Sequence, residues 1–220
     1  MNFINLVQET RNRVGIQGVG PSSIDTTTYE AQVVSAVKDS WLNIQNLRPV
    51  WKWMRDTKSF LISQGVSEYT PLTIFGPNHR HRTWLKDTFY ITSNGNKSSL
   101  RYVDYDVYIN RYINNIVEGP FYEFTIRPYD NALLFPLPDE AYSIDCDYQK
   151  SPQELTTDSA VPELPGYFHM AIVYGAVQLY AAAIGFLEVY DEFSTQHAIV
   201  LGNLMREQNP RERLKVRGIA

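Results

Sequence analysis

The stretch YFHMAIVYGAVQLYAAAI, residues 167–184, decides how this chain can fold. Residues 170–187 carry no charged side chain, so this part of the sequence approaches the roughly 20 apolar residues that a membrane-spanning helix needs. It also contains Gln178 together with tyrosine, glycine and alanine residues, and a helix that is apolar on all sides can equally well be buried among other helices. We therefore predict a buried helix at residues 167–184 and no association with a membrane.

A buried helix needs partners, and the two ends of the chain provide three further helical patterns. Apolar side chains at helical spacing predict a helix at residues 3–14, a second at residues 28–48, before Pro49, and another that runs to about Gln208, before Pro210. Each end of the chain alone has too few apolar residues for a stable core. We therefore expect the two ends to pack together.

The residues between these helices change to strand patterns. Short β-branched or aromatic runs at residues 88–92, 100–103, 122–127, 132–135 and 142–148 predict strands, and the alternation of Phe60 and Ile62 marks another. Turns are expected at Asn94-Gly95 and Asp130-Asn131, because Asn and Gly accept positive φ angles at low cost. Residues 104–112 are expected to interrupt the strands with a short helix.

The predicted fold class is therefore α+β, with an antiparallel helical bundle formed by both ends of the chain and an inserted β-rich lobe. In this division, residues 1–48 and 163–208 form the helical body, residues 49–162 form the lobe, and residues 209–220 form an extended C-terminal arm.

The composition excludes some functions and favours others. Cys146 is the only cysteine, which excludes a disulfide within the chain and a zinc site built on cysteines, and which fits folding in a reducing compartment. The formal net charge of −4 gives no reason to expect nucleic acid as the main ligand. The charged residues Glu9, Arg11 and Arg13 are not expected in a signal peptide. The 15 Tyr, 10 Phe and 4 Trp suit either protein interfaces or a β-rich core.

Several short stretches carry a family resemblance through their order and spacing. They are NFINL at residues 2–6, IQNLRPVWKWM at 44–54, RPY at 127–129 with FPLPD at 135–139, and DYQKSP at 147–152 with VPELP at 161–165. In these stretches, over nearly the whole chain, the sequence resembles the head-to-tail adaptor proteins of short-tailed bacteriophages, which are also called head-completion or connector proteins.

This resemblance implies a structural virion protein and no enzymatic activity, cofactor or metal. It implies a homo-oligomeric ring of about twelve copies at the head-tail junction, which binds the portal protein on one side and a tail or nozzle protein on the other. Such a ring would be assembled in the cytoplasm of the host bacterium and would form a conduit for double-stranded DNA during packaging and genome ejection. A net negative chain fits a conduit, because strong phosphate contacts would retain the DNA.

Two groups of residues in the predicted lobe can be interpreted as chemical sites. His79 and His81, with Asp87 nearby, could join a metal site or provide a general base, but the spacing favours a solvated loop. Asp145 and Asp147 flank Cys146 and would share one face of a strand, where they could bind a cation, although a solvent-facing strand surface explains them equally well.

Aromatic and imidazole side chains in or near the predicted helices also have two interpretations. Trp51 and Trp53, beside Lys52 and Arg55, could stack on single-stranded nucleic acid, but packing at a helix-to-strand junction is the better explanation. His169 and His197 lie beside apolar positions of predicted helices, so we interpret both as hydrogen-bonded packing residues.

The alternative function is a carbohydrate-binding or hydrolytic module of a phage tail. It is suggested by the tyrosine-rich β lobe and by the acidic residues Glu118, Glu123 and Asp130, since sugar hydrolysis uses paired carboxylates. A phosphate-binding glycine-rich loop, a Gly-x-Ser-x-Gly motif and a His-Glu-x-x-His motif are all missing from the sequence.

The predicted interface residues lie in the C-terminal arm. They are Arg211, Arg213, Leu214, Lys215, Val216 and Arg217. In an extended chain the basic side chains would alternate with aliphatic ones, and residues 211–220, with four basic side chains and one acidic, have a local charge of +3. We predict that this arm attaches to an acidic groove of a neighbour, the alternative being a terminal tail without fixed structure.

Overall fold

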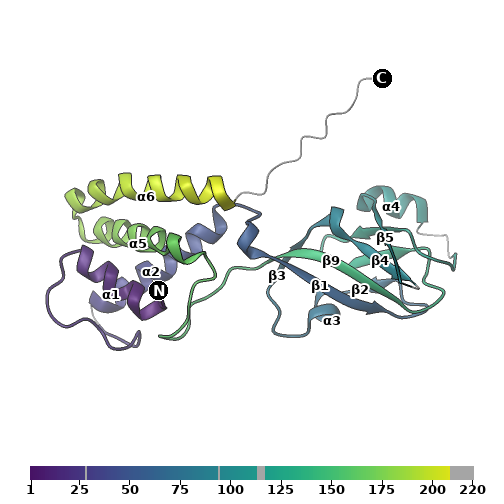
Figure 1. The fold of residues 1–220 in the computed structure, drawn as a ribbon, viewed down its shortest axis with the longest axis horizontal. Helices are drawn as coiled ribbons and strands as arrows, with labels where there is room; N and C mark the ends of the chain where they lie inside the picture. The colour runs from purple at the N-terminus through teal and green to yellow at the C-terminus, as the bar shows by residue number, and fades with distance from the viewer. Residues whose placement is uncertain (28, 94, 113–116, 209–220) are drawn as a thin grey trace, which may run out of the picture. The chain divides into compact units, whose positions relative to one another are not determined.

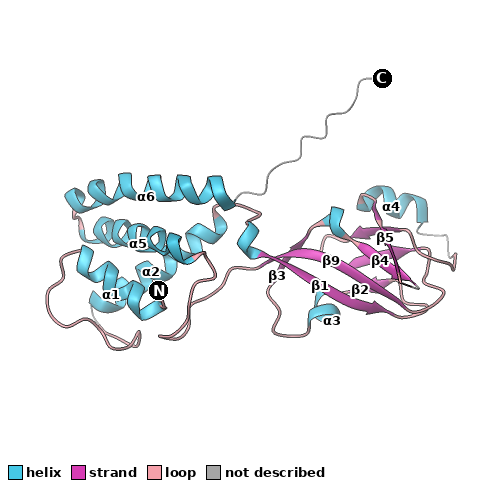
Figure 2. Ribbon diagram, in the orientation of Figure 1, coloured by secondary structure: helices cyan, strands magenta, loops and turns pink. Residues whose placement is uncertain are grey.

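The computed structural model describes residues 1–27, 29–93, 95–112 and 117–208, and these residues have a mixed α+β fold, as predicted (Figures 1 and 2). Contacts within the chain divide it into two compact units. One, here called the helical unit, is formed by Met1–Met54 with Pro152–Ala220, and the other, the β unit, by Arg55–Ser151.

Four main helices build the helical unit. They are α1 (Phe3–Arg13), α2 (Tyr29–Asn46), α5 (His169–Ile184) and α6 (Leu187–Gln208), with the short 3-10 helices η1 (Lys52–Met54) and η3 (Gly166–Phe168). Helix α1 begins where the Asn2 side chain accepts a hydrogen bond from the backbone N–H of Asn5, and α2 ends shortly before Pro49. The four main helices follow the sequence patterns because each has an apolar face to bury.

Helix α5 is the centre of this unit, because it packs against α1, α2 and α6. Its fully buried residues include Ile172, Val173 and Val177, which join Phe3 and Trp41 in one apolar core. Residues Gly166–Ile184 are long and apolar enough to cross a membrane, but they pack as the core helix of a folded unit does. Burial against three helices therefore accounts for their composition.

The helical unit includes more of the chain than the predicted helical body, which comprised residues 1–48 and 163–208. It extends further at both of its inner boundaries. Trp51 and Met54, just before the β unit begins, belong to the helical core, and so does Leu155 after it ends. The backbone N–H of Gln153 and its carbonyl both bond to the side chain of Gln45 in α2. Apolar burial and these two hydrogen bonds hold residues 49–54 and 152–162 in the helical unit.

Two sheets form the β unit. The larger contains β1 (Arg55–Ile62), β9 (Tyr142–Lys150), β4 (Tyr90–Ser93) and β5 (Asn96–Ser99) in the order β1-β9-β4-β5, with β3 (His81–Trp84) also paired to β9. The smaller has the order β2-β8-β7-β6, from β2 (Glu68–Tyr69), β8 (Ala132–Phe135), β7 (Glu123–Ile126) and β6 (Arg101–Tyr102). The short helices are α3 (Pro71–Phe75), α4 (Tyr105–Tyr112) and η2 (Lys86–Thr88).

Strand β9 shows why the larger sheet forms. Its side chains alternate, so that Tyr142, Ile144 and Cys146 are buried in the core of the β unit whereas Asp145 and Asp147 point to the other face. The predicted turn at Asp130-Asn131 joins β7 to β8, with Asp130 at a φ of 64°. The sequence pattern therefore predicted both the face and the turn correctly.

Some elements of the β unit were not predicted or differ in extent. Strands β2, β3 and β5 and helix α3 had no strong pattern in the sequence, and β5 in particular has four exposed polar residues. Thr88, at the start of a predicted strand, instead ends η2, where its hydroxyl donates to the carbonyl of Leu85. Pairing with neighbouring strands, rather than local preference, defines these segments.

Candidate interaction surfaces

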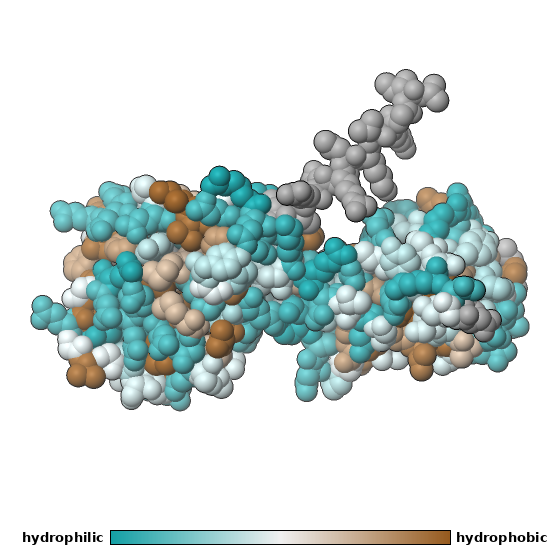
Figure 3. All heavy atoms as spheres, in the orientation of Figure 1, coloured by the Kyte–Doolittle hydropathy of each residue, from teal (hydrophilic) through white to brown (hydrophobic). Residues whose placement is uncertain are grey.

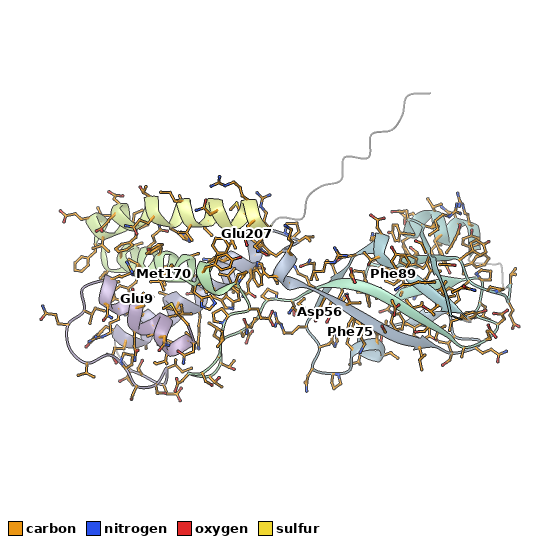
Figure 4. All side chains as sticks on the ribbon, viewed as in Figure 1. Glu9, Asp56, Phe75, Phe89, Met170 and Glu207 are labelled. Carbon is orange, nitrogen blue, oxygen red and sulfur yellow. The ribbon has the colours of Figure 1, made fainter. Side chains whose placement is uncertain are left out.

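His81 lies within an aromatic cluster of the β unit, so the predicted solvated loop is wrong for this residue. Its ring centroid is 4.4 Å from that of Trp84, 5.4 Å from that of Phe75 and 5.8 Å from that of Tyr148 (Phe75 is labelled in Figure 4). The loop prediction failed because His81 begins strand β3, which pairs with the central strand β9 and brings the imidazole onto these rings.

The surroundings of His81 oppose a charged imidazole. Burial, with a smaller contribution from the neighbouring His79, lowers its pKa from 6.5 to about 4. The Nε2 atom is buried without a hydrogen-bond partner. A neutral ring stacked on apolar neighbours explains the cluster as packing. Within the described residues, no group of three His, Cys, Asp or Glu side chains is arranged to hold a metal ion.

Asp145 and Asp147 share the face of β9 that the sequence predicted, but each has protein partners. The Asp145 carboxylate accepts hydrogen bonds from Ser59 Oγ at 2.6 Å and from Lys97 Nζ at 2.8 Å. These bonds hold the pKa of Asp145 below its usual value. Asp147 accepts from Arg55 Nε at 2.8 Å. The two carboxylates therefore join strands β1, β9 and β5, and their charges are balanced without a bound cation.

The two tryptophans at residues 51 and 53 contribute to the interior of the helical unit. Trp51 is fully buried, and its Nε1 donates to the carbonyl of Gln45 at 3.2 Å. Trp53 packs on the same core and stacks on Trp41, with ring centroids 5.3 Å apart. Trp51 is buried and Trp53 is partly buried against Trp41, so packing within the helical unit accounts for both rings.

The two histidines in the helical unit are packing residues, as predicted. His169 Nε2 lies 3.0 Å from the carbonyl oxygen of Leu164, and His197 Nδ1 lies 3.0 Å from Gln178 Oε1. Burial lowers the pKa of both imidazoles. Gly175 of α5 allows the close approach here, since a Cβ atom at this position would lie 3.0 Å from His197 Nε2.

Of the three acidic residues that suggested a sugar-active site, Glu123 is not available for one. Glu123 is 0% exposed, forms an ion pair with Arg101 on the adjacent strand, and accepts a hydrogen bond of 2.6 Å from the Tyr112 hydroxyl. A carboxylate that is buried and bonded in this way cannot reach a saccharide. Asp130 lies in the β7–β8 turn, and burial raises its pKa. Glu118 forms an isolated β-bridge with Leu137.

The predicted interface residues, from Arg211 to Arg217, lie outside the described residues. Sequence reasoning missed a different surface, the α5–α6 tip, which we define as Ile184, Phe186, Leu187 and Tyr190. Gly185, in the left-handed region at a φ of 79°, ends α5 and directs the chain into α6. The signal was available, because apolar residues directly follow this helix-ending glycine where a turn between helices is usually polar.

All four side chains of the α5–α6 tip are substantially exposed. Phe186 is 53% and Leu187 69% exposed, and the turn from Gly185 to Val189 lines an open hollow of about 430 Å³. Figure 3 shows hydrophobic residues at the surface over α6 among hydrophilic ones. Single exposed apolar residues are ordinary, but a contiguous group of this kind is typical of an interaction site.

Comparison with known proteins shows the family to which this chain belongs. No curated protein matches the chain in sequence. The family model described as SU10 adaptor protein matches residues 1–213, which is nearly the whole chain and includes both units. The match supports a structural, adaptor role in a bacteriophage, in agreement with the resemblance seen in the sequence. The chain belongs to the SU10 adaptor protein family.

Proposed function

We propose that this protein forms a ring at the head-tail junction of a bacteriophage and joins the portal to the tail. The observation that carries the proposal is the family match over residues 1–213. The exposed α5–α6 tip gives further support, because a protein that assembles with neighbours needs apolar surface outside its own core.

In this proposal the two parts of the chain have separate tasks. The helical unit is an antiparallel bundle formed by both ends of the chain, and the β unit is an inserted lobe that presents loops and sheet edges to a second partner. Strand β1 has β9 on one side, and no other described strand pairs with it. An open edge of this kind can pair with a strand of another protein.

The ring contains twelve copies and provides a conduit for double-stranded DNA. It is assembled in the cytoplasm of the host bacterium, on the portal, and binds the tail or nozzle protein on the opposite side. The net charge of −4 suits this task, because a negatively charged protein makes few contacts with phosphates and such contacts would slow the passage of DNA. No cofactor, metal or membrane has a part in it.

The mass of the assembly tests this function. Native mass spectrometry of the complex released from purified virions is expected to give twelve times the chain mass of 25.4 kDa, with the portal protein as the directly cross-linked neighbour. Absence of the chain from purified virions would overturn the structural role, and a trimer or a monomer would favour the sugar-active tail module instead.

A further inference from the structure

The α5–α6 tip combines exposed apolar side chains with unpaired negative charge. Glu188, Asp191 and Glu192 lie in the first turns of α6, next to Leu187 and Tyr190, and all three are exposed. Within the described part of the chain, none of these carboxylates forms an ion pair or a side-chain hydrogen bond. The tip therefore favours a partner that brings both apolar and basic side chains.

The surroundings of the tip do not neutralise this charge. Residues 151–205 contain six acidic residues and no lysine or arginine. Arg13 of α1 packs against α6, with its guanidinium carbon 6.0 Å from the centre of the Phe193 ring. Arg13 is already bonded to Glu9, at 2.8 Å. An incoming cation would thus meet carboxylates that no described basic residue already pairs.

The C-terminal segment of this chain has the matching composition. Residues 211–217 read RERLKVR, in which four basic residues accompany Leu214 and Val216. An acidic-apolar surface and a basic-apolar segment are complementary in both charge and hydrophobicity. We propose that the C-terminal segment of one copy docks on the α5–α6 tip of a second copy, a contact that rests on the proposed ring and would close it from subunit to subunit.

The length of the C-terminal segment shows whether it can contact the tip of its own chain or only the tip of a second copy. Helix α6 rises about 1.5 Å per residue, so Leu187 lies about 31 Å from Gln208, where the described part of α6 ends. Leu214 follows Gln208 by six residues, and even a fully extended chain would carry it only about 20 Å. Leu214 thus cannot reach Leu187 of its own α6. A neighbouring copy, related by rotation about a ring axis, can supply it.

A disulfide experiment on the full chain tests this contact. A variant with Leu187→Cys and Leu214→Cys is incorporated into phage particles and treated with a mild oxidant. The native Cys146 is 1% exposed, and burial raises its pKa to about 12, so it will not compete. We expect a ladder of disulfide-linked multimers on a non-reducing gel, because each copy would be linked to the next.

Matched variants define the alternatives. Each single-cysteine chain should give no species above a dimer. The pair Leu61→Cys with Leu214→Cys probes the open edge of β1, where Leu61 is 77% exposed, and should give no ladder. A ladder from this pair alone would place the segment on a sheet edge and overturn the proposal. A bond within one chain, or no bond in particles whose heads and tails are joined, would also overturn it while leaving the adaptor function intact.

Charge gives a second, independent measurement. Glu188→Gln, Asp191→Asn and Glu192→Gln together should slow ladder formation about tenfold, the effect expected when three exposed ion pairs are lost. The matched control neutralises Asp56, Glu140 and Glu154, which lie elsewhere, and should leave the rate unchanged. Equal rates for the two triple variants would show that the acidic residues of the tip do not select the segment.

Discussion

The indole ring of Trp41 in α2 stacks on that of Trp53, with ring centroids 5.3 Å apart and an angle of 26° between the ring planes. Trp51 adds a third ring, 6.1 Å from Trp53. These contacts join η1, the last element before the β unit, to the core of the helical unit. The position of the three rings therefore sets the point along the chain where the helical unit ends.

Truncation of Trp41 should be among the most destabilising changes in the helical unit. The side chain is 1% exposed, so Trp41→Ala is expected to cost about 3 to 5 kcal/mol of unfolding free energy through lost burial and the cavity left behind. The measurement is denaturant unfolding followed by far-UV circular dichroism. Ile199→Ala, on the exposed face of α6, serves as the control and should cost less than about 1 kcal/mol. A Trp41→Ala loss below that of the control would contradict the packing.

Two glycines in the helices should respond in opposite directions to the same substitution. In Gly175→Ala the new Cβ atom would lie 2.4 Å from Ser40 Oγ, so we expect destabilisation of about 1 to 3 kcal/mol. In Gly202→Ala the Cβ atom would meet nothing within 4 Å, and the better helix propensity of alanine should stabilise α6 by up to about 1 kcal/mol. Thermal unfolding of both variants checks this contrast. Stabilisation by both substitutions would mean that α2 and α5 lie further apart than the 2.4 Å approach to Ser40 Oγ implies.

The stability of the β unit should fall as the pH is lowered from about 6.5 to about 4. The unfolded His81 imidazole takes up a proton near pH 6.5, whereas the folded one does so only near pH 4, so the unfolded state binds more protons between these values. Because solvent partly screens this half-buried ring, we expect a loss of about 1 to 2 kcal/mol.

Substitution of His81 tests the origin of this pH dependence. His81→Phe keeps the ring stacked on Trp84 and removes the titrating group, so it should flatten the dependence of stability on pH over this window. His79→Asn should retain most of the slope, because burial is the larger cause of the lowered pKa. NMR titration of the imidazole protons reports the pKa directly, and a value near 6.5 for His81 would refute the burial argument.

The purified protein should remain in aqueous solution without detergent, although α5 has the length and hydropathy of a membrane span. Nine of its residues are buried against the other helices, so they are not available to lipid. Flotation with phosphatidylcholine and phosphatidylglycerol vesicles measures this property, and we expect the protein in the lipid-free fraction. Migration with the vesicles would mean that α5 leaves its core.

The sequence by itself determined the helices of this protein and its longest inner strand. Helices α1, α2, α5 and α6 have regular apolar spacing with a capping Asn2, a Gly185 or a following proline at their ends, and β9 alternates buried and half-buried residues from Tyr142 to Asp147. Such local signals are sufficient because each of these elements buries one whole face. The short sequence stretches that resemble phage adaptor proteins likewise indicated the correct family.

Only the tertiary structure decided the environment of individual side chains. His81 looks like a loop residue in the sequence. In the structure it begins β3, which pairs with β9, a strand far from it along the chain. This pairing places the imidazole ring against Trp84 and Tyr148. Glu123 looks like a surface carboxylate, but its strand lies next to Arg101, which balances its buried charge. The sequence shows the apolar residues of the α5–α6 tip, but only the structure shows that no described element covers them. Burial and pairing depend on contacts between distant residues, and local sequence does not contain them.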